Sequence, residues 1–201
     1  MPKIVDHDVR REEVLNAAIR VICRVGLDKT TTRLIAVEAG YSNGVLVNYF
    51  DDKDAILQSV VEMTHRLHRS RTETLLRGKD PMAALEALVF QELPLDEERR
   101  VETLLEMSFW TRAASNPVLA AFQTESANQL LRHIRMRIRD VRDVGLLHSD
   151  LSDSSIAELL ISVIDGMSVH SILFPTRLPP RSMRKLMRAE LRALGFELPT
   201  P

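Results

Sequence analysis

Apolar residues recur at intervals of three and four along most of this chain, and this spacing constrains the fold more than any other feature. Val14, Ala18, Ile22 and Val25, for example, trace one side of a helix. We find no segment with the apolar–polar alternation of a half-buried strand. Aromatic residues are only 4% of the chain, which also favours helices over a sandwich of strands. The sequence therefore predicts an all-α fold.

Glycine, proline and polar breaks divide this pattern into helical segments of very different length. We expect helices at about 9–25, 32–39, 43–49, 53–76, 81–93, 97–115, 117–143, 154–174 and 180–195. The two shortest lie within the first fifty residues, and a long amphipathic helix follows them. We therefore divide the chain into an N-terminal three-helix domain of residues 1–52 and a C-terminal helical bundle of residues 53–201.

The cellular setting follows from what the sequence carries at its start and in its cysteine content. The first residues lack the apolar core of a signal peptide, and no run of about 18 apolar residues is present. The single Cys23 cannot form an internal disulfide, which fits a reducing compartment. Because its neighbours are apolar, we expect Cys23 to be buried. These features predict a cytoplasmic protein without a membrane span.

The two short helices and the turn between them form a helix-turn-helix pattern. The Thr31 hydroxyl can cap the first helix, and Gly40 permits the left-handed turn that ends it. Leu34, Ile35 and Ala39 are expected to supply its apolar face. Such a pair, supported by a third helix, can place its second helix in the major groove of DNA. The alternative is a helical hairpin that serves packing only.

The second short helix carries side chains suited to base recognition. Asn43 and Asn48 offer amides to base edges, Val45 and Val47 can contact thymine methyl groups, and Gly44 allows close approach of the backbones. The remaining candidate DNA contacts, mostly to phosphates, are Thr31, Arg33, Tyr41, Ser42, Tyr49 and Lys53. Residues 1–53 hold eight basic and eight acidic side chains, so bulk charge gives this proposal no support.

The segment from Thr30 to Val60 resembles the DNA-binding signature of the TetR family of bacterial repressors. The matching residues are Thr31, Ile35, Ala36, Ala39, Gly40, Ser42, Gly44, Leu46, Tyr49, Phe50, Lys53 and Leu57. Val47 departs from it, since many members carry an aromatic residue there, and Leu34 fills a place that is often polar. The resemblance implies an all-α homodimer that binds a palindromic operator in double-stranded DNA. It also implies release when a small-molecule effector binds the C-terminal domain.

A weaker resemblance links the chain to the choline-responsive subgroup of that family. It rests on Ser42-Asn43-Gly44, Asn48-Tyr49-Phe50, Phe109-Trp110, Asn116-Pro117 and Ile164-Asp165-Gly166. Our candidate effector contacts are Met63, Leu67, Phe90, Glu106, Met107, Trp110, Phe122 and Met167. An aromatic face such as that of Trp110 could hold a cation, although a full cage needs several aromatic residues. The alternative for each apolar residue is an ordinary place in the core.

The most apolar region is the tail, from Ile156 to Phe174, which is apolar around much of its circumference. A helix of this kind is buried on several sides, so we expect residues 154–174 and 180–195 to form a homodimer interface. Ile164 is expected at that interface. Two other classes stay open: a ligand-independent helical protein that binds a partner through this tail, and an enzyme that processes a small molecule in the C-terminal cavity.

Catalytic, metal and cofactor motifs give no positive signal in this sequence. It has no Gly-x-Ser-x-Gly, no phosphate-cradling glycine loop and no HExxH, so we expect no enzyme, cofactor or metal. His65 and His68, three residues apart, are expected to be surface residues. The basic run Arg132, Arg135, Arg137, Arg139 and Arg142 is expected to be a solvated surface.

Overall fold

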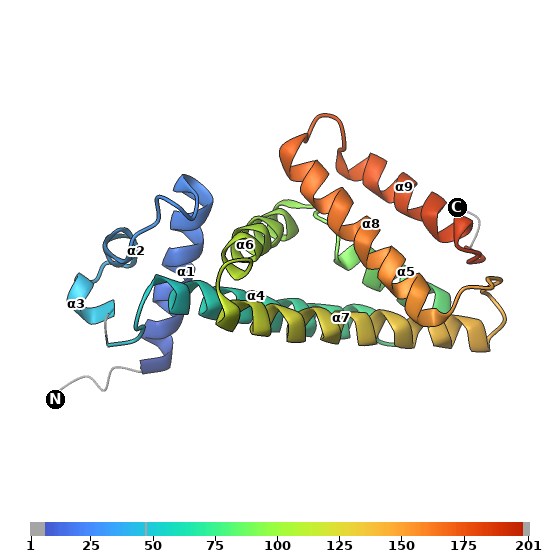
Figure 1. Cartoon of the computed structure of the whole chain (residues 1–201), viewed down its shortest axis with the longest axis horizontal. Helices are drawn as coiled ribbons and strands as arrows, with labels where there is room; N and C mark the ends of the chain where they lie inside the picture. The colour runs from blue at the N-terminus through green and yellow to red at the C-terminus, as the bar shows by residue number, and fades with distance from the viewer. Residues whose placement is uncertain (1–6, 47, 199–201) are drawn as a thin grey trace. The chain divides into compact units, whose positions relative to one another are not determined.

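The computed structural model describes residues 7–46 and 48–198, and within them the chain is all-α. The helices are α1 (His7–Val25), α2 (Thr32–Ala39), α3 (Asn43–Leu46), α4 (Lys53–Leu76), α5 (Pro81–Gln91), α6 (Glu97–Ala113), α7 (Pro117–Asp143), α8 (Asp153–Leu173) and α9 (Pro180–Ala193) (Figure 1). An isolated antiparallel bridge joins Leu147 to Phe196. The all-α prediction is therefore confirmed. Val47 lies outside the described residues.

The helix boundaries agree with the periodicity wherever a helix is long or clearly capped. α2, α4 and α7 begin and end where the sequence predicts. α3 is shorter than predicted, because the backbone at Asn48 and Tyr49 forms a turn and not a helix. There the Asn48 amide donates to the Val45 carbonyl at 3.2 Å, and the Tyr49 amide donates to the Leu46 carbonyl at 2.9 Å. Each of these hydrogen bonds joins residues three apart, as in a 3₁₀-helix, whereas the bonds of an α-helix join residues four apart.

The chain folds into two compact units, and each of them uses two separate stretches of sequence. The first, here called the head unit, contains the residues up to His68 together with Leu104–Leu119. The second, the body unit, contains Arg69–Thr103 and the chain from Ala120 onward. The helices α4, α6 and α7 are therefore each divided between the two units.

The head unit is built around α1, whose buried side forms a nearly continuous apolar stripe. Its buried residues are Val14, Leu15, Ala17, Ala18, Val21 and Ile22. Ile35 and Ala36 of α2, Leu46 of α3 and Phe109 of α6 are also buried. Two expectations are wrong here: Leu34 is 41% exposed, and Cys23 is exposed. Both side chains lie outside the buried stripes of their helices, and local apolar neighbours do not predict this.

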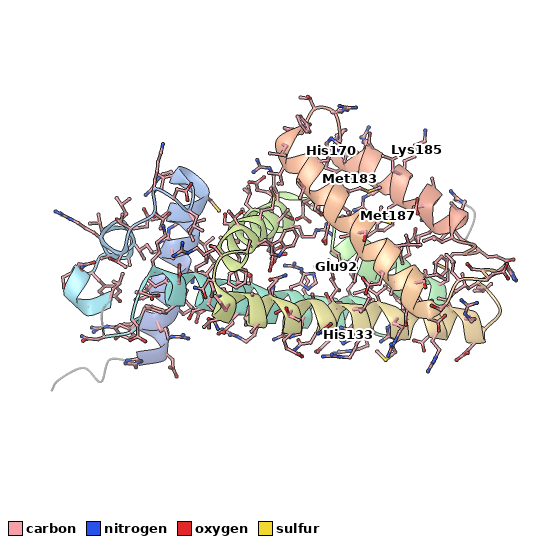
Figure 2. All side chains as sticks on the ribbon, in the orientation of Figure 1. Glu92, His133, His170, Met183, Lys185 and Met187 are labelled. Atoms are coloured by element: carbon pink, nitrogen blue, oxygen red, sulfur yellow. The ribbon has the colours of Figure 1, made fainter. Side chains whose placement is uncertain are left out.

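The body unit has one large apolar core that α5, α7, α8 and α9 share. Figure 1 shows α8 and α9 side by side, and Figure 2 shows Met183 and Met187 of α9 on the side nearest α8, with Lys185 on the outer side. Both methionines are buried. By length and composition alone α8 could span a membrane. It lies instead with one side in this core.

The buried side of α8 carries Ile156, Leu160, Ile164 and Ser168, four residues apart. Ile164 is only 3% exposed and belongs to the core of its own unit, so the expectation that it contacts a second copy is wrong. The helix has a second, outer face. There Leu159 is 43% and Leu173 58% exposed. α8 is therefore apolar on two sides, of which only one is covered within the chain.

Candidate nucleic-acid interface and ligand site

Both ends of α2 are capped by the residues that the sequence predicts. The Thr31 side-chain oxygen accepts the Leu34 amide at 3.2 Å, and Thr31 itself is extended, at φ −127° and ψ 154°. Gly40 ends the helix in the left-handed conformation, at φ 75° and ψ 24°. A side chain at this position would be strained, so glycine is the suitable residue. The turn that follows therefore leaves α2 in a fixed direction.

The residues of the turn and of α3 divide into an exposed polar set and a buried apolar set. Ser42, Asn43, Gly44 and Asn48 are exposed. Leu46 and Phe50 are 1% and 7% exposed, and they anchor the segment in the head unit. Val45 is half-buried between these sets, and Arg33 of α2 is exposed. The structure thus brings most of the predicted DNA contacts onto one short segment, with their amides and hydroxyls open to a ligand.

Polar residues of α1 hold the aromatic side chains of this segment. The Tyr41 hydroxyl donates to the Glu13 carboxylate, and this hydrogen bond raises the pKa of Tyr41. The Arg10 guanidinium lies 5.6 Å from the centre of the Tyr41 ring. The His7 ring lies 4.3 Å from that of Tyr49. Two of the predicted phosphate contacts, Tyr41 and Tyr49, are therefore engaged with α1.

Arg11, the next residue of α1, also supports an aromatic side chain of this segment. Its guanidinium lies 5.2 Å from the centre of the Phe50 ring, and its Nη2 donates to the Ser59 hydroxyl at 2.8 Å. The motifs in the sequence do not reveal these supporting residues. His7, Arg10 and Arg11 share one side of α1 by their spacing, and this is the signal that could have found them.

The first turn of α4 is tied to the rest of the head unit by polar contacts. Asp52 caps the helix, since its Oδ1 accepts the Ala55 amide at 2.8 Å. The Lys53 ammonium donates to the Leu27 carbonyl at 2.6 Å, in the connection between α1 and α2. An ammonium group has three donors, so Lys53 retains two for another partner.

Asp54 links this same turn to α6 and to the start of α7. The Arg112 Nε donates to Asp54 Oδ1 at 2.8 Å, and the Arg112 Nη2 donates to Oδ2 at 3.0 Å. The Asn116 amide donates to Oδ2 at 3.2 Å. The Arg112 guanidinium is the main reason why the pKa of Asp54 lies below its ordinary value. One carboxylate therefore fastens α6 to the first turn of α4.

The predicted effector contacts fall into two groups, one in each unit. Met63, Leu67, Glu106, Met107 and Trp110 belong to the head unit, whereas Phe90, Phe122 and Met167 belong to the body unit. Leu67 is 58% exposed and Met63 is buried. Phe90, Phe122 and Met167 are half-buried, and the Arg184 guanidinium lies 5.3 Å from the centre of the Phe90 ring.

In the head unit, Glu106 and Trp110 form the most distinctive pair. They lie four residues apart on α6 and so share one side of that helix. The Glu106 carboxylate is hydrogen-bonded to Nε2 of His65 on α4. The Trp110 ring nitrogen is buried, yet it has no hydrogen-bond partner within residues 7–46 and 48–198. A buried donor without an acceptor is costly, and an acceptor on a bound molecule would satisfy it.

Comparison with known proteins gives two family matches and several full-length relatives. Residues 14–60 match the model for bacterial regulatory proteins of the tetR family. Residues 81–195 match the model for the C-terminal domain of BetI-type transcriptional repressors. The HTH-type transcriptional regulator PksA of Bacillus subtilis strain 168 is 25% identical over 199 residues, which cover 98% of this chain and 95% of PksA.

The HTH-type transcriptional regulator BetI of Burkholderia cenocepacia strain HI2424 is 27% identical over 190 residues, covering 92% of this chain and 94% of BetI. A transcriptional regulator from Saccharomonospora viridis, solved in complex with choline, has a TM-score of 0.89. Its sequence identity is 24%, and the match covers 96% of this chain and all of that one. This likeness shows that the two chains share a fold.

The contact of Asp54 with Arg112 predicts a pH-dependent contribution to stability. Because the folded-state pKa of Asp54 is lowered, its stabilising effect is present above about pH 4 and is lost as the pH falls through the folded value. We expect Asp54→Asn to lower the free energy of unfolding by about 1 kcal/mol at pH 7, a modest figure because solvent screens the pair. The difference from the parent protein should shrink as the pH falls below about 4 and should vanish once the pH is below the folded-state pKa of Asp54.

Urea unfolding at a series of pH values, at fixed protein concentration, measures this difference. Glu125→Gln is the matched control, since Glu125 pairs with Arg132 while both side chains are more than half exposed. It should change stability little at any pH. A loss for Asp54→Asn that stayed constant from pH 7 to pH 3 would contradict the charged contact.

Proposed function

Because the chain belongs to the TetR family of bacterial regulatory proteins and is a DNA-binding transcriptional regulator, we propose that it binds a palindromic operator as a homodimer and releases it on binding a small cationic effector. The observation that carries the DNA proposal is the exposed polar rim of Ser42, Asn43 and Asn48 on a segment whose apolar residues are buried. We infer that the protein acts in the cytoplasm, where its DNA is found.

We assign base recognition to α3 and the turn after it. The amides of Asn43 and Asn48 can each pair with an adenine edge, and Gly44 lets the backbone approach the DNA. Val45 and Val47 are the candidate contacts to thymine methyl groups. Residues 1–52 thereby carry most of the DNA-binding function.

We assign the phosphate contacts to side chains that have hydrogen-bond donors available for DNA. Arg33 is exposed on α2, and the Ser42 hydroxyl stands at the start of α3. Thr31 and Lys53 flank the segment, and Lys53 has donors beyond its bond to Leu27. We assign Tyr41 and Tyr49 mainly to holding the segment, since both contact α1.

The charge balance of the N-terminal residues indicates that one head unit alone binds DNA weakly. Residues 1–53 have equal numbers of basic and acidic side chains, so the non-specific attraction to phosphates is small. Two heads on one operator would bind far more tightly, since the second binding event is intramolecular. We therefore infer that spacing of the heads controls affinity, with half-sites about one helical turn, ~34–36 Å, apart or somewhat more.

We place the dimer interface on the outer face of α8 and on α9. Leu159, Leu173 and Phe174 are each more than 40% exposed there, and Leu186 of α9 is 48% exposed. The small exposed residues Ser162 and Gly166 would let a partner helix come close. A second copy would cover the apolar face that the chain leaves open.

We place the effector beside Glu106 and Trp110 and assign it to small organic cations that carry a hydrogen-bond acceptor. The indole face and the Glu106 carboxylate would attract the positive charge, and the acceptor would satisfy the buried indole nitrogen. The relative from Saccharomonospora viridis was solved with choline, which has both features. Choline is therefore the first compound to test.

The contacts of α6 offer a route from this site to the DNA-binding segment. Glu106 bonds to His65 on α4, and Arg112, six residues further on, bonds to Asp54 in the first turn of α4. Lys53, a proposed phosphate contact, is the neighbour of Asp54. A ligand that prefers another position of α6 would therefore also shift the DNA-contacting residues, as a change in population between two states.

Substitution of Asn48 and Lys53 separates base recognition from phosphate binding. Asn48→Ala should cost about 1–3 kcal/mol on the preferred operator and should relax selectivity at one base pair. Lys53→Ala should weaken binding to every sequence. It should also reduce the slope of the logarithm of affinity against the logarithm of salt concentration by about one. Fluorescence anisotropy with operators selected from random duplexes measures both.

Asn16→Ala and Lys79→Ala serve as matched controls, since both side chains are exposed elsewhere on the chain. Urea unfolding of Lys53→Ala shows whether loss of its bond to Leu27 destabilises the head unit. Equal losses from Asn48→Ala and Lys53→Ala on all sequences would remove Asn48 from base recognition.

Substitution on the outer face of α8 tests the dimer. Leu173→Glu should raise the dimer dissociation constant by at least about tenfold, because a charge would be buried at the interface. Sedimentation velocity reports the dimer, and operator affinity should fall with it. Val144→Glu is the control, since Val144 is 53% exposed directly after α7 in the body unit. An unchanged dimer would favour the alternative that this face binds a different protein.

Trp110 is the only tryptophan of the chain, so its fluorescence reports directly on the proposed effector site. Choline should change this fluorescence, and its neutral isostere 3,3-dimethylbutanol should bind at least about tenfold more weakly. Glu106→Gln should weaken choline binding, whereas the exposed control Glu97→Gln should not. Equal binding of the cation and the neutral isostere would exclude a cationic effector and leave the DNA-binding proposal intact.

A further inference from the structure

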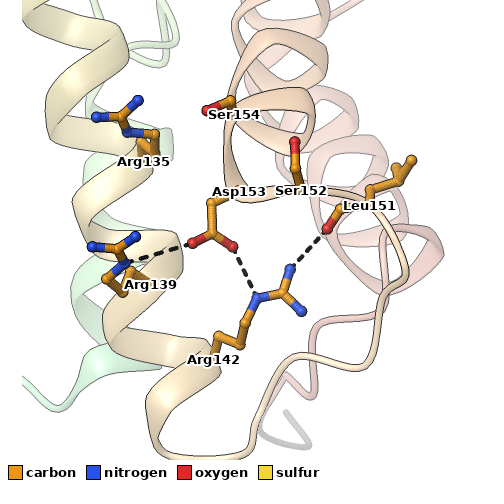
Figure 3. Close-up of a pocket in the computed structure, with 7 residues that line it drawn as sticks. All are labelled: Arg135, Arg139, Arg142, Leu151, Ser152, Asp153 and Ser154. Atoms are coloured by element: carbon orange, nitrogen blue, oxygen red, sulfur yellow. Dashed lines mark hydrogen bonds and ion pairs between the residues drawn. The ribbon is translucent and has the colours of Figure 1, made fainter.

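A pocket of about 460 Å³ lies in the body unit between the end of α7 and the start of α8. Three arginines line it from the α7 side, Arg135, Arg139 and Arg142, and Asp153 and Ser154 line it from the α8 side (Figure 3). The volume is within the range of sites for small organic ligands. Glu106 and Trp110 are not among its lining residues.

Arg142 and Asp153 form the fixed wall of this pocket. The Arg142 Nε donates to Asp153 Oδ1 at 2.8 Å, and its two terminal nitrogens donate to the backbone carbonyls of Ser149 and Leu151 at 3.1 and 2.9 Å. The guanidinium is thus held in place by three partners. Since Asp153 neutralises Arg142, these two residues together contribute no net charge to the pocket.

Arg135 and Arg139 supply the positive charge of the pocket that Asp153 does not neutralise. Arg139 Nε is 3.9 Å from Asp153 Oδ2, and its side chain is 73% exposed. Arg135 is exposed, and within the described ranges it has no hydrogen bond or ion pair. Three arginines and one aspartate leave two positive charges facing a single hollow.

The other two arginines of the basic run on α7 are paired with acidic residues. The surplus of positive charge is therefore specific to the pocket. Arg132 pairs with Glu125 at 3.0 Å and Arg137 with Asp140 at 2.9 Å, in both cases on the same helix. These two residues fit the solvated surface that the sequence predicts. Arg135, Arg139 and Arg142 instead follow the four- and three-residue spacing that places them on one side of α7, along the pocket.

We propose that this pocket binds a small phosphate monoester, with its dianionic phosphate between Arg135 and Arg139. Two guanidinium groups match the charge of the dianion, and their planar forks suit its oxygens. The Ser154 hydroxyl, at the first turn of α8, adds a donor on the other wall. The pocket is larger than a phosphate ion needs, and Leu151 supplies an apolar surface for the organic group.

Calorimetric titration with glycerol 2-phosphate tests this assignment on the full chain. The parent protein should bind the ester, and Arg135→Ala combined with Arg139→Ala should weaken binding at least about tenfold. The control combines Arg69→Ala with Arg77→Ala, which removes the same charge from exposed positions outside the pocket and should leave binding unchanged. Potassium chloride keeps the ionic strength constant throughout.

Two further titrations distinguish specific binding of the phosphate monoester from non-specific attraction of anions. Inorganic phosphate should bind more weakly than the ester, because it makes no use of the apolar wall. Arg135→Lys combined with Arg139→Lys should lose some of the affinity, since charge is kept but the fork geometry is not. Absence of binding to the parent protein, or an equal loss in the pocket variant and the control, would overturn the proposal. Circular dichroism confirms that each variant is folded.

Discussion

A helix of four residues makes too few backbone hydrogen bonds to be stable alone, and α3 therefore depends on the side chains buried at its end. Leu46 and Phe50 supply this anchorage, and Arg11 covers the Phe50 ring while bonding to Ser59 of α4. The exposed Asn43 keeps its position because these neighbours are fixed. The proposed DNA-contacting surface of amides and hydroxyls is thus held by buried apolar side chains and by polar residues of α1.

The same arrangement explains how a head without surplus charge can serve in DNA binding. Several of its cations are already in use within the protein: Arg20 and Arg24 hold Glu38, and Arg11 holds the segment around Phe50. Glu38, in turn, has a lowered pKa because both arginines bond to it. The placement of a few free donors then matters more for affinity than their number.

Periodicity and capping rules predict most of the fold, because they depend on neighbours in sequence. Thr31 and Gly40 are examples, since each acts on groups within a few residues. The sequence cannot show which apolar side of α8 faces its own core, so the prediction for Ile164 is wrong. For the same reason the burial expected for Leu34 and Cys23 is wrong, and the contact of Lys53 with Leu27 is not predicted. Each depends on residues distant in sequence.

The divided course of α6 has a consequence for how such regulators can be recombined. Its second half, from Leu104, belongs to the same compact unit as the helix-turn-helix, although 35 residues of the body unit separate the two stretches in sequence. A chimera joined after the first sixty residues would transfer Asp54 but not Arg112 or Asn116. Exchange of operator specificity between relatives therefore requires two crossovers, or an acceptor whose α6 already carries compatible partners for the incoming head.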